Sequence, residues 1–597
     1  MLNSRWKNME VNILIMLFFG IFSFLLTFVF TKLGTIVLSG DGSFHFSRVE
    51  ELYDNFRNGK LTFVASRTFS STGVGTFLFY PSILLYPWVI LRLIFSPVTS
   101  FYVWYGLMLF ITMCVAYYSM WLFDKDRVRA TIFGILYTIF PYHIHLGIAH
   151  LVVGEFLAYT FIPLFFIGLY YCLVDRKKWY LLGIGWTLIL YSHIVSAYIT
   201  LLGAIAISII YMIVDTKSIK RVMINLSKNI ILVTLLSSFV LITFVTDFIG
   251  AGIKAPNGAI FGYLGSFQEI FLESVKNATD TNRSVGVFAI FTTIVGCYFV
   301  RKSRVEEKIA YGLGVFILLC TSTIFPWRLF NNTIIGRVLG AIQFPYRLNT
   351  YVGFFLMVTF SLILSKLIHS ISNRNAKVLL ISGIMIFLMA SYYGSLTDLF
   401  VKIHESQGNL LGKNTKLAKT IPNEAIIKNS NYHNIFDYSI LYGEIDYYPS
   451  VSFNNLQEGN DITAEVNPKI NSILSHRVII GGKEKVKIPK VASNYIEYNV
   501  KADKKEKIDI PVLAYKRTKV MLNGKNVGYT ASSRGTVMVD GEKGNNKISV
   551  TYQPSKLLYV GIIVSFITWI GLLIGLIFSK KKKCELARWC LLYVEVE

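Results

Sequence analysis

The chain has 597 residues, of which 53% are hydrophobic and 16% charged, with a formal net charge of +24. This composition is typical of a helical protein with many membrane spans and excludes an ordinary soluble domain. The lysines and arginines lie mostly in short loops between apolar segments, where they set orientation and meet anionic lipid. We therefore do not expect nucleic acid as a partner.

The six cysteines lack metal-ligand spacing, and the large polar region contains none, which argues against a disulfide scaffold or a structural zinc. The sequence has no P-loop, dinucleotide loop, HExxH motif or nucleophile elbow. Chemistry driven by ATP is therefore not expected.

Twelve apolar segments are predicted to cross the membrane, and the first, from Val11 to Leu38, is read as a signal anchor. The others lie near 100–122, 129–146, 156–174, 179–194, 195–214, 229–250, 285–300, 309–325, 348–366, 377–395 and 557–579. Placing every basic cluster in the cytoplasm gives one consistent alternation with both termini inside the cell. The run Phe77–Phe95, which holds Pro81 and Pro87, breaks this alternation if counted, so we expect a re-entrant or juxtamembrane helix there.

The first outer loop, about 39–99, opens with Asp41 between two glycines. A helix is predicted from about Ser43, with Asp41, His45 and Arg48 at i, i+4 and i+7 on one side and apolar residues on another. We expect this helix to lie on the bilayer and to present its polar row. Asp41 could then take a proton from an acceptor hydroxyl, while His45 and Arg48 orient it or bind phosphate. The simpler interpretations are an N-cap aspartate or an ion pair that fixes the helix.

Further candidates lie at the outer ends of later spans. Arg347, in Gln343-Phe344-Pro345-Tyr346-Arg347, has the planar guanidinium that suits a phosphate, although a snorkelling anchor is the simpler interpretation. Arg67 is a second candidate for the same task. Glu155 is interpreted as a second acid or as a first-turn helix carboxylate, and His193 as a phosphate donor or a turn histidine.

Residues 397–556 are predicted to form a separate polar domain outside the cell, followed by the last span and a basic cytoplasmic tail in 557–597. Short alternating strands such as Arg477–Ile480 and Thr536–Val539 stand before glycine turns. This pattern predicts an all-β sandwich.

The run Asp41-Gly42-Ser43-Phe44-His45, with Arg48, Leu52 and Asn58-Gly59, resembles the first outer loop of the YfhO-like bacterial membrane proteins. That family is annotated in part as pterin-synthase-related and is related to the GT-C glycosyltransferases. Gly154-Glu155, Ser192-His193 and Gln343–Arg347 follow in the order expected of the family. The resemblance covers most of the chain.

The resemblance implies a GT-C-like transmembrane domain over 1–396 and transfer of a sugar from a polyprenyl phosphate to a cell-surface polymer, such as a teichoic acid, or to a glycolipid. Asp41 matches the first-loop aspartate that acts in GT-C enzymes as base or metal ligand. No second acid of the Asp-x-Asp kind stands beside it, so no metal ligand is assigned and a divalent cation stays an open question.

The predicted protein is thus a cell-membrane glycosyltransferase with Asp41, His45 and Glu155 as catalytic residues. Arg48, Arg67, His193, Tyr346 and Arg347 would bind phosphate or substrate, and the aromatic-rich stretches 69–80 and 326–346 would hold the sugar and the lipid chain. Its partners would be the lipid-linked sugar, the polymer acceptor and membrane lipid. The alternatives are a flippase for lipid-linked sugars and a non-catalytic assembly or sensor protein.

Overall fold

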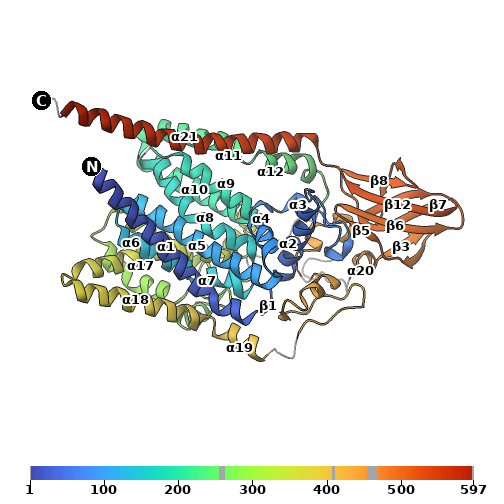
Figure 1. Ribbon diagram of the computed structural model, residues 1–597, viewed down its shortest axis with the longest axis horizontal. Helices are drawn as coiled ribbons and strands as arrows, with labels where there is room; N and C mark the ends of the chain where they lie inside the picture. The colour runs from blue at the N-terminus through green and yellow to red at the C-terminus, as the bar shows by residue number, and fades with distance from the viewer. Residues whose placement is uncertain are drawn as a thin grey trace.

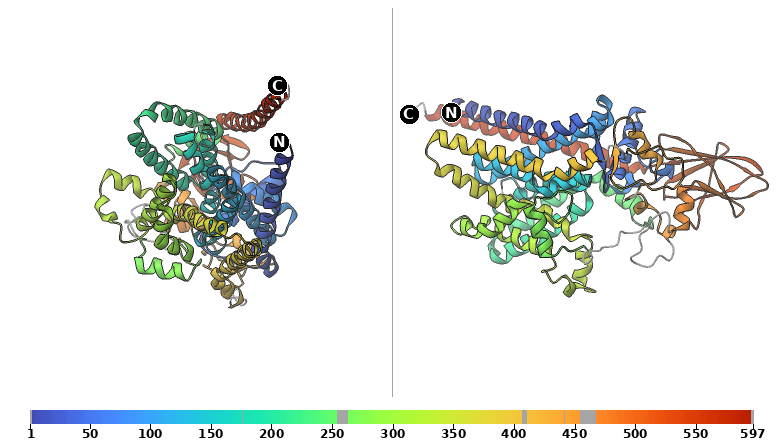
Figure 2. Two further views of the ribbon diagram at one scale, coloured as in Figure 1. Left: turned by 90° about the vertical axis from the view of Figure 1, so that its left-hand side faces the viewer. Right: turned by 90° about the horizontal axis from the view of Figure 1, so that it is seen from below.

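A bundle of helices carries a β-sandwich at one end, and the start of α1 and the end of α21 lie at the opposite end (Figure 1). The computed structural model describes residues 2–175, 177–253, 263–405, 410–440, 442–453 and 467–594. The last helix, α21, runs along the outside of the bundle (Figures 1 and 2). The β-sandwich and the two outermost helix ends thus lie on opposite sides of the bundle. A membrane that the bundle crosses would therefore have the sandwich on one side and these helix ends on the other.

Each of the twelve predicted apolar segments falls on a helix. These helices are α1 (Leu2–Leu33), α5 (Pro97–Asp124), α6 (Arg127–Thr138), α8 (Val153–Tyr170), α9 (Tyr180–Ser192), α10 (Ile194–Val214), α11 (Ile219–Leu236), α14 (Val287–Val300), α15 (Val305–Cys320), α17 (Asn349–Ser370), α18 (Arg374–Ser395) and α21 (Lys556–Val594). Within the described residues, seven helices are long and apolar enough to cross a membrane. The number rises to nine if each of two bent helix pairs counts as one span. The chain is therefore a multi-pass membrane protein, while the count of twelve and the sidedness stay predictions.

The two bent pairs interrupt predicted spans. α6 continues through a 48° bend into the segment Pro141–Ala149, which begins with α7 (Pro141–Ile144). α11 continues through a 73° bend into α12 (Ser238–Thr243) and Phe244–Phe248. Pro141 explains the first bend, because proline lacks the N–H that a continuous helix needs.

Shorter helices fill the loops. They are α2 (Gly42–Arg57), α3 (Thr76–Phe79), α4 (Tyr86–Ile94), α13 (Phe267–Val275), α16 (Ile334–Gly340), α19 (Thr397–Glu405) and α20 (Pro468–Leu474). The run 77–95 thus contains α3, a 3-10 turn at Ile83–Leu85 and α4, which confirms that it is not one continuous span. The prolines separate these pieces, and Pro87 lies in the first turn of α4, where its missing N–H costs nothing.

The sandwich consists of two five-stranded antiparallel sheets, with strand orders β10-β11-β7-β3-β4 and β5-β6-β12-β8-β9. The strands are β3 (Arg477–Ile480), β4 (Lys483–Val486), β5 (Lys490–Ala492), β6 (Tyr495–Ala502), β7 (Glu506–Leu513), β8 (Thr518–Leu522), β9 (Lys525–Val527), β10 (Thr530–Ala531), β11 (Thr536–Gly541) and β12 (Gly544–Tyr552). Alternate apolar residues of both sheets form one buried core. The predicted β-sandwich is confirmed for this part of the chain.

Residues 425–440 and 442–453, which form the cover, lie before the sandwich and pack on the loop 39–99. Strand β1 (Ile36–Leu38), at the end of the first span, pairs antiparallel with β2 (Ala425–Ile427). Tyr432 and Ile435 belong to the same buried core as the residues of α2. The polar region 397–556 is therefore divided between this cover and the sandwich.

The position of α2 differs from the predicted one. The helix forms where the sequence predicts it, but every residue from Gly42 to Leu52 is buried, as is Asn55. The expectation of a helix lying on the bilayer is wrong, because protein segments rather than lipid cover its apolar side. The buried carboxylate of Glu51 also binds the loop beneath it, accepting hydrogen bonds from Ser66 N at 2.9 Å and Thr68 N at 2.9 Å.

Candidate functional site

The predicted site residues meet at the sandwich end of the bundle, where α2 and α8 begin, α9 ends and a 3-10 turn (Pro345–Leu348) leads into α17. His45, Arg48 and Gly154 line one narrow crevice. Seven of the eight predicted residues take part in this cluster: Asp41, His45, Arg48, Glu155, His193, Tyr346 and Arg347. The eighth, Arg67, does not.

Asp41 stands directly before α2, and its backbone oxygen accepts a hydrogen bond from His45 N at 3.0 Å. Its carboxylate does not cap the helix, and among the described residues it has no hydrogen-bond or ion-pair partner. Burial raises the pKa of Asp41 to about 6; the positive charge of Arg347 lowers it in part and the nearby carboxylate of Asp446 raises it. Asp41 is therefore the N-cap residue by position, as the simpler interpretation predicts, but its carboxylate neither caps the helix nor forms an ion pair and is free, with an elevated pKa.

Glu155 and Arg347 form a pair beside Asp41. Oε2 of Glu155 lies 3.6 Å from Nε of Arg347, and Oε1 accepts hydrogen bonds from Tyr142 at 3.0 Å and Thr350 at 3.3 Å. Nη1 of Arg347 also donates to the side chain of Gln343 at 2.5 Å. Arg347 thus points into the protein and is not a snorkelling anchor.

Arg48 is a buried cation of a different kind, only 1% exposed. Its Nη2 donates to the carbonyl oxygens of Tyr80 at 3.2 Å and Pro81 at 2.6 Å, and its guanidinium lies 4.4 Å from the centre of the Tyr80 ring. Within the described part of the chain no carboxylate pairs with it, and its Nε has no partner. Burial lowers the pKa of Arg48 to about 10, so it still carries its charge at neutral pH. A buried charge without a carboxylate partner is costly, so this position suits an anionic ligand.

The two histidines of the cluster are neutral. Burial and the neighbouring cation Arg48 lower the pKa of His45, and burial and Arg347 lower that of His193. Nδ1 of His193 accepts a hydrogen bond from Ser196 N at 3.3 Å, which assigns the proton to Nε2. Nδ1 of His45 is buried without a partner. His193, at the junction of α9 and α10 as predicted, can therefore donate through Nε2.

Tyr346 also belongs to the cluster. Its ring stacks on Phe344 with centroids 5.1 Å apart, and electrostatic interactions link its phenol to Arg347, Glu155 and Asp41. The aromatic pair thus lies beside the charged residues, where a sugar ring could pack.

Arg67 lies elsewhere. Its guanidinium pairs with Asp54 at 3.2 Å, with 37% of the Arg67 side chain exposed, and its backbone N donates to Glu51 at 3.0 Å. Arg67 therefore stabilises the fold of the loop and does not belong to the cluster.

The sequence did not single out three residues of the cluster. Tyr80 stands between the rings of His45 and His193, each with its centroid 6.0 Å away. Asp446 and Tyr447 come from the cover, and the Tyr447 ring stacks on Phe44 and Phe79, each at 6.2 Å. The only signal for Tyr80 was the aromatic-rich stretch 69–80, and no signal pointed to Asp446.

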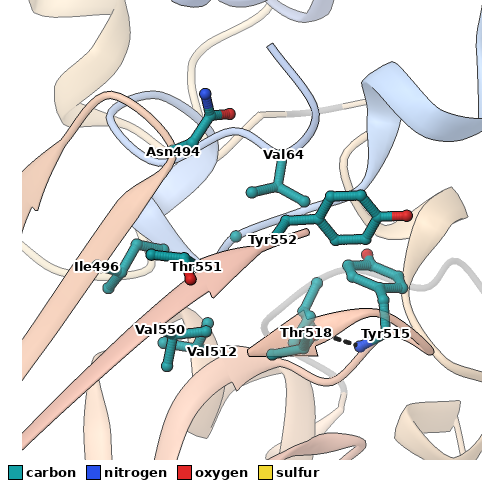
Figure 3. A pocket seen from close by; sticks show the side chains of 11 residues that line it. Val64, Asn494, Ile496, Val512, Tyr515, Thr518, Val550, Thr551 and Tyr552 are labelled. Atoms are coloured by element: carbon teal, nitrogen blue, oxygen red, sulfur yellow. Dashed lines mark hydrogen bonds between the residues drawn. The ribbon is translucent and has the colours of Figure 1, made fainter. Parts of the chain in front are cut away.

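A second crevice lies where the loop 39–99 meets the sandwich, lined by residues such as Val64, Asn494, Tyr515 and Tyr552 (Figure 3). It contains no charged side chain and shows no catalytic group. The Tyr515 hydroxyl accepts from Gly75 N at 2.9 Å and donates to Tyr447 O at 2.8 Å. This junction therefore fixes the segments that carry Tyr80 and Asp446.

Among the described residues, no group of three or more His, Cys, Asp or Glu side chains is arranged to hold a metal ion.

The fold and the cluster define a multi-pass helical membrane protein with a β-sandwich and a charged site at one end of its bundle. No protein-family model matches the chain, and no curated protein does. Among solved structures it is similar to arabinofuranosyltransferase AftD from Mycobacteria, with 13% identity and a TM-score of 0.41. The match covers 90% of this chain and 40% of that one, so the chain spans less than half the length of AftD. The resemblance to YfhO-like proteins therefore still depends on the motifs quoted above.

Proposed function

We propose that the chain is a membrane glycosyltransferase that moves a sugar from a polyprenyl-phosphate donor to a cell-surface glycopolymer or glycolipid on the outer leaflet. The observation that carries this proposal is the free carboxylate of Asp41 beside Arg347, with Arg48 on the same helix row. A base and cations for a leaving phosphate are the two requirements of glycosyl transfer from such a donor. The class of donor comes from the sequence resemblance.

In this mechanism Asp41 accepts the proton of the acceptor hydroxyl while the acceptor oxygen forms a bond to the anomeric carbon of the sugar. The bond from that carbon to the phosphate oxygen breaks, and its electron pair leaves on the polyprenyl phosphate. Arg48, Arg347 and the Nε2–H of His193 stabilise the negative charge of the leaving group. A base with a pKa of about 6 suits this task, because it is mostly deprotonated at neutral pH and still basic enough to accept the proton.

Glu155 takes a positioning role in this proposal. Its carboxylate already binds Arg347, Tyr142 and Thr350, so it is committed to protein partners. It holds the Arg347 guanidinium toward Asp41. Of the two predicted catalytic acids, Asp41 and Glu155, this proposal gives only Asp41 a chemical step.

The flippase alternative predicts broken helices and charges paired in the middle of the bundle. Two broken helices are present. However, the first break supplies Tyr142 to Glu155, and the charged cluster lies at helix ends. These positions favour a site at the membrane rim, as transfer to a surface acceptor needs.

The test is transfer by the purified full-length protein in lipid, using radiolabelled polyprenyl-phosphate hexoses and a mixed acceptor extract. Asp41→Asn, which removes the base with little change of shape, should abolish transfer while folding stays normal. Asp54→Asn is the matched control, because Asp54 lies on the same helix in a partly exposed pair. Equal transfer by wild type and Asp41→Asn would remove Asp41 from the mechanism. Flipping of the same lipids without transfer would favour the flippase.

A further inference from the structure

Tyr80 has a hydroxyl that no described residue binds, although the ring is held from several sides. The Tyr80 carbonyl accepts from Arg48 at 3.2 Å, and the Arg48 guanidinium lies over the ring at 4.4 Å. The residue therefore fixes Arg48 through its backbone and its ring face. The phenol hydroxyl takes no part in holding Arg48 and can contact a ligand.

The hydroxyl lies against the backbone of Gly154, next to Glu155. A Cβ at position 154 would overlap the Tyr80 oxygen and would also approach the His193 ring at 3.3 Å. Only glycine leaves room for the phenol at this place. The Gly154-Glu155 pair thus combines the space for Tyr80 with the carboxylate that holds Arg347.

The phenol acts as a donor and not as a base. Burial raises the pKa of Tyr80 above its ordinary value of 10.0; Arg48 and Arg347 lower it in part, and the carboxylates of Asp41 and Glu155 raise it. The hydroxyl therefore keeps its proton at neutral pH. An O–H donor forms a stronger hydrogen bond with a charged oxygen than with a neutral one.

Two further polar atoms of the same crevice lack partners in the described part of the chain: Nε of Arg48 and Nδ1 of His45. Arg48 supplies a positive charge that no carboxylate pairs with. A phosphate oxygen would accept from both Arg48 and Tyr80. A neutral sugar hydroxyl would satisfy the phenol but would leave the cation without a counter-charge.

We propose that Tyr80 contacts the substrate, donating a hydrogen bond from its phenol to a phosphate oxygen of the lipid-linked donor that Arg48 faces. This inference rests on the proposed function and names a further residue of its site. Its rival is a packing role, in which the ring clamps Arg48 and the hydroxyl contributes nothing.

The experiment measures binding of undecaprenyl phosphate and of undecaprenol to the full-length protein in lipid. Tyr80→Phe removes one oxygen and keeps the ring, and it should weaken binding of the phosphate about tenfold without changing that of the alcohol. The control is Tyr86→Phe, whose phenol lies outside the cluster with its ring against Phe56. Binding to this variant should equal that of wild type.

A second variant tests the same contact if the Tyr80→Phe protein does not fold. Replacing Tyr80 with 3-fluorotyrosine keeps the ring and makes the hydroxyl a stronger donor, so it should bind the phosphate more tightly than wild type. A packing role predicts the opposite change, because fluorine withdraws electron density from the ring face that holds Arg48 and so weakens that contact.

The outcomes separate the two proposals. If wild type binds the phosphate and Tyr80→Phe binds it equally well, the role of Tyr80 is overturned while the proposed donor class stands. If wild type binds the alcohol as well as the phosphate, the polyprenyl-phosphate donor is overturned, and the phosphate contact with it.

Discussion

Oε2 of Glu155, in the first turn of α8, lies 3.6 Å from Nε of Arg347, just before α17, and this pair joins two helices that are far apart in the sequence. Both side chains are largely buried, with 3% and 12% exposure. Breaking a buried pair leaves one uncompensated charge. The pair therefore fixes the direction in which Arg347 faces Asp41.

Glu155→Gln should lower transfer and stability together. Glutamine keeps an oxygen for Tyr142 and Thr350 but loses the charge that holds Arg347, so we expect a loss of roughly 1–3 kcal/mol in the free energy of unfolding. The measurement is the unfolding midpoint beside the KM for the donor, which should rise. Glu273→Gln, in an exposed pair with Lys276, is the control and should change neither. An unchanged KM would show that Glu155 does not position Arg347.

The transfer rate should rise with pH and reach a plateau above about pH 7. Asp41 acts only when deprotonated, and its pKa is raised to about 6 from an ordinary 3.8. A profile of kcat/KM against pH checks this, and a rate that falls from pH 5 to 7 would exclude a carboxylate base.

The raised pKa of Asp41 also makes the stability of the fold depend on pH. Its contribution to the free energy of unfolding falls as pH rises, whereas the transfer rate rises. The folded state holds the Asp41 proton more tightly than the unfolded state, so this group stabilises the fold below about pH 3.8, and the contribution is lost as pH rises to about 6. Asp41→Asn should therefore raise the unfolding midpoint at pH 8 and have little effect at pH 4. A lower midpoint at pH 8 would mean that the carboxylate supports the fold.

Local features of this site could be predicted from the sequence. The helix after Asp41, the junction at His193 and the strand Arg477–Ile480 lie where residue spacing, the lengths of the apolar segments and glycine turns predict them. Each depends on a few neighbouring residues, which is the range over which such patterns act.

Long-range features could not be predicted. The amphipathic pattern of α2 is the same whether lipid or protein covers its apolar side, so the burial of the helix beneath Tyr432 and Ile435 was missed. Arg67 and Arg347 are both arginines of predicted outer loops. Only the fold shows that one pairs with Asp54 and the other with Glu155.

Gly154→Ala should reproduce the loss of the Tyr80 hydroxyl. The added Cβ would overlap the phenol oxygen, and relieving the overlap moves the ring away from Arg48 at a cost of about 1–3 kcal/mol. Binding of undecaprenyl phosphate should weaken as in Tyr80→Phe. Gly203→Ala is the matched control, because open space surrounds this glycine of α10. If the Gly154→Ala protein binds undecaprenyl phosphate as tightly as wild type, phosphate binding does not depend on the position of the Tyr80 ring.

Arg48→Met should separate function from stability. A buried cation without a carboxylate partner costs free energy, so replacing it with an apolar side chain of similar length should leave the unfolding midpoint unchanged or raise it. Binding of undecaprenyl phosphate should nevertheless fall at least tenfold, because the counter-charge of the phosphate is gone.

Arg129→Met is the comparison for Arg48→Met, because it removes a buried arginine that does have carboxylate partners. Arg129 is equally buried, but it pairs with Asp124 and with the buried Glu307 at 2.6 Å. Its removal leaves Glu307 with only the partly exposed Arg304, 3.6 Å away, and should cost about 3 kcal/mol. Arg129 lies at the far end of α6 from the cluster, and donor binding by the folded fraction should not change. If Arg48→Met loses as much stability as Arg129→Met, Arg48 is a structural cation held by the carbonyls of Tyr80 and Pro81, and a different group must hold the phosphate.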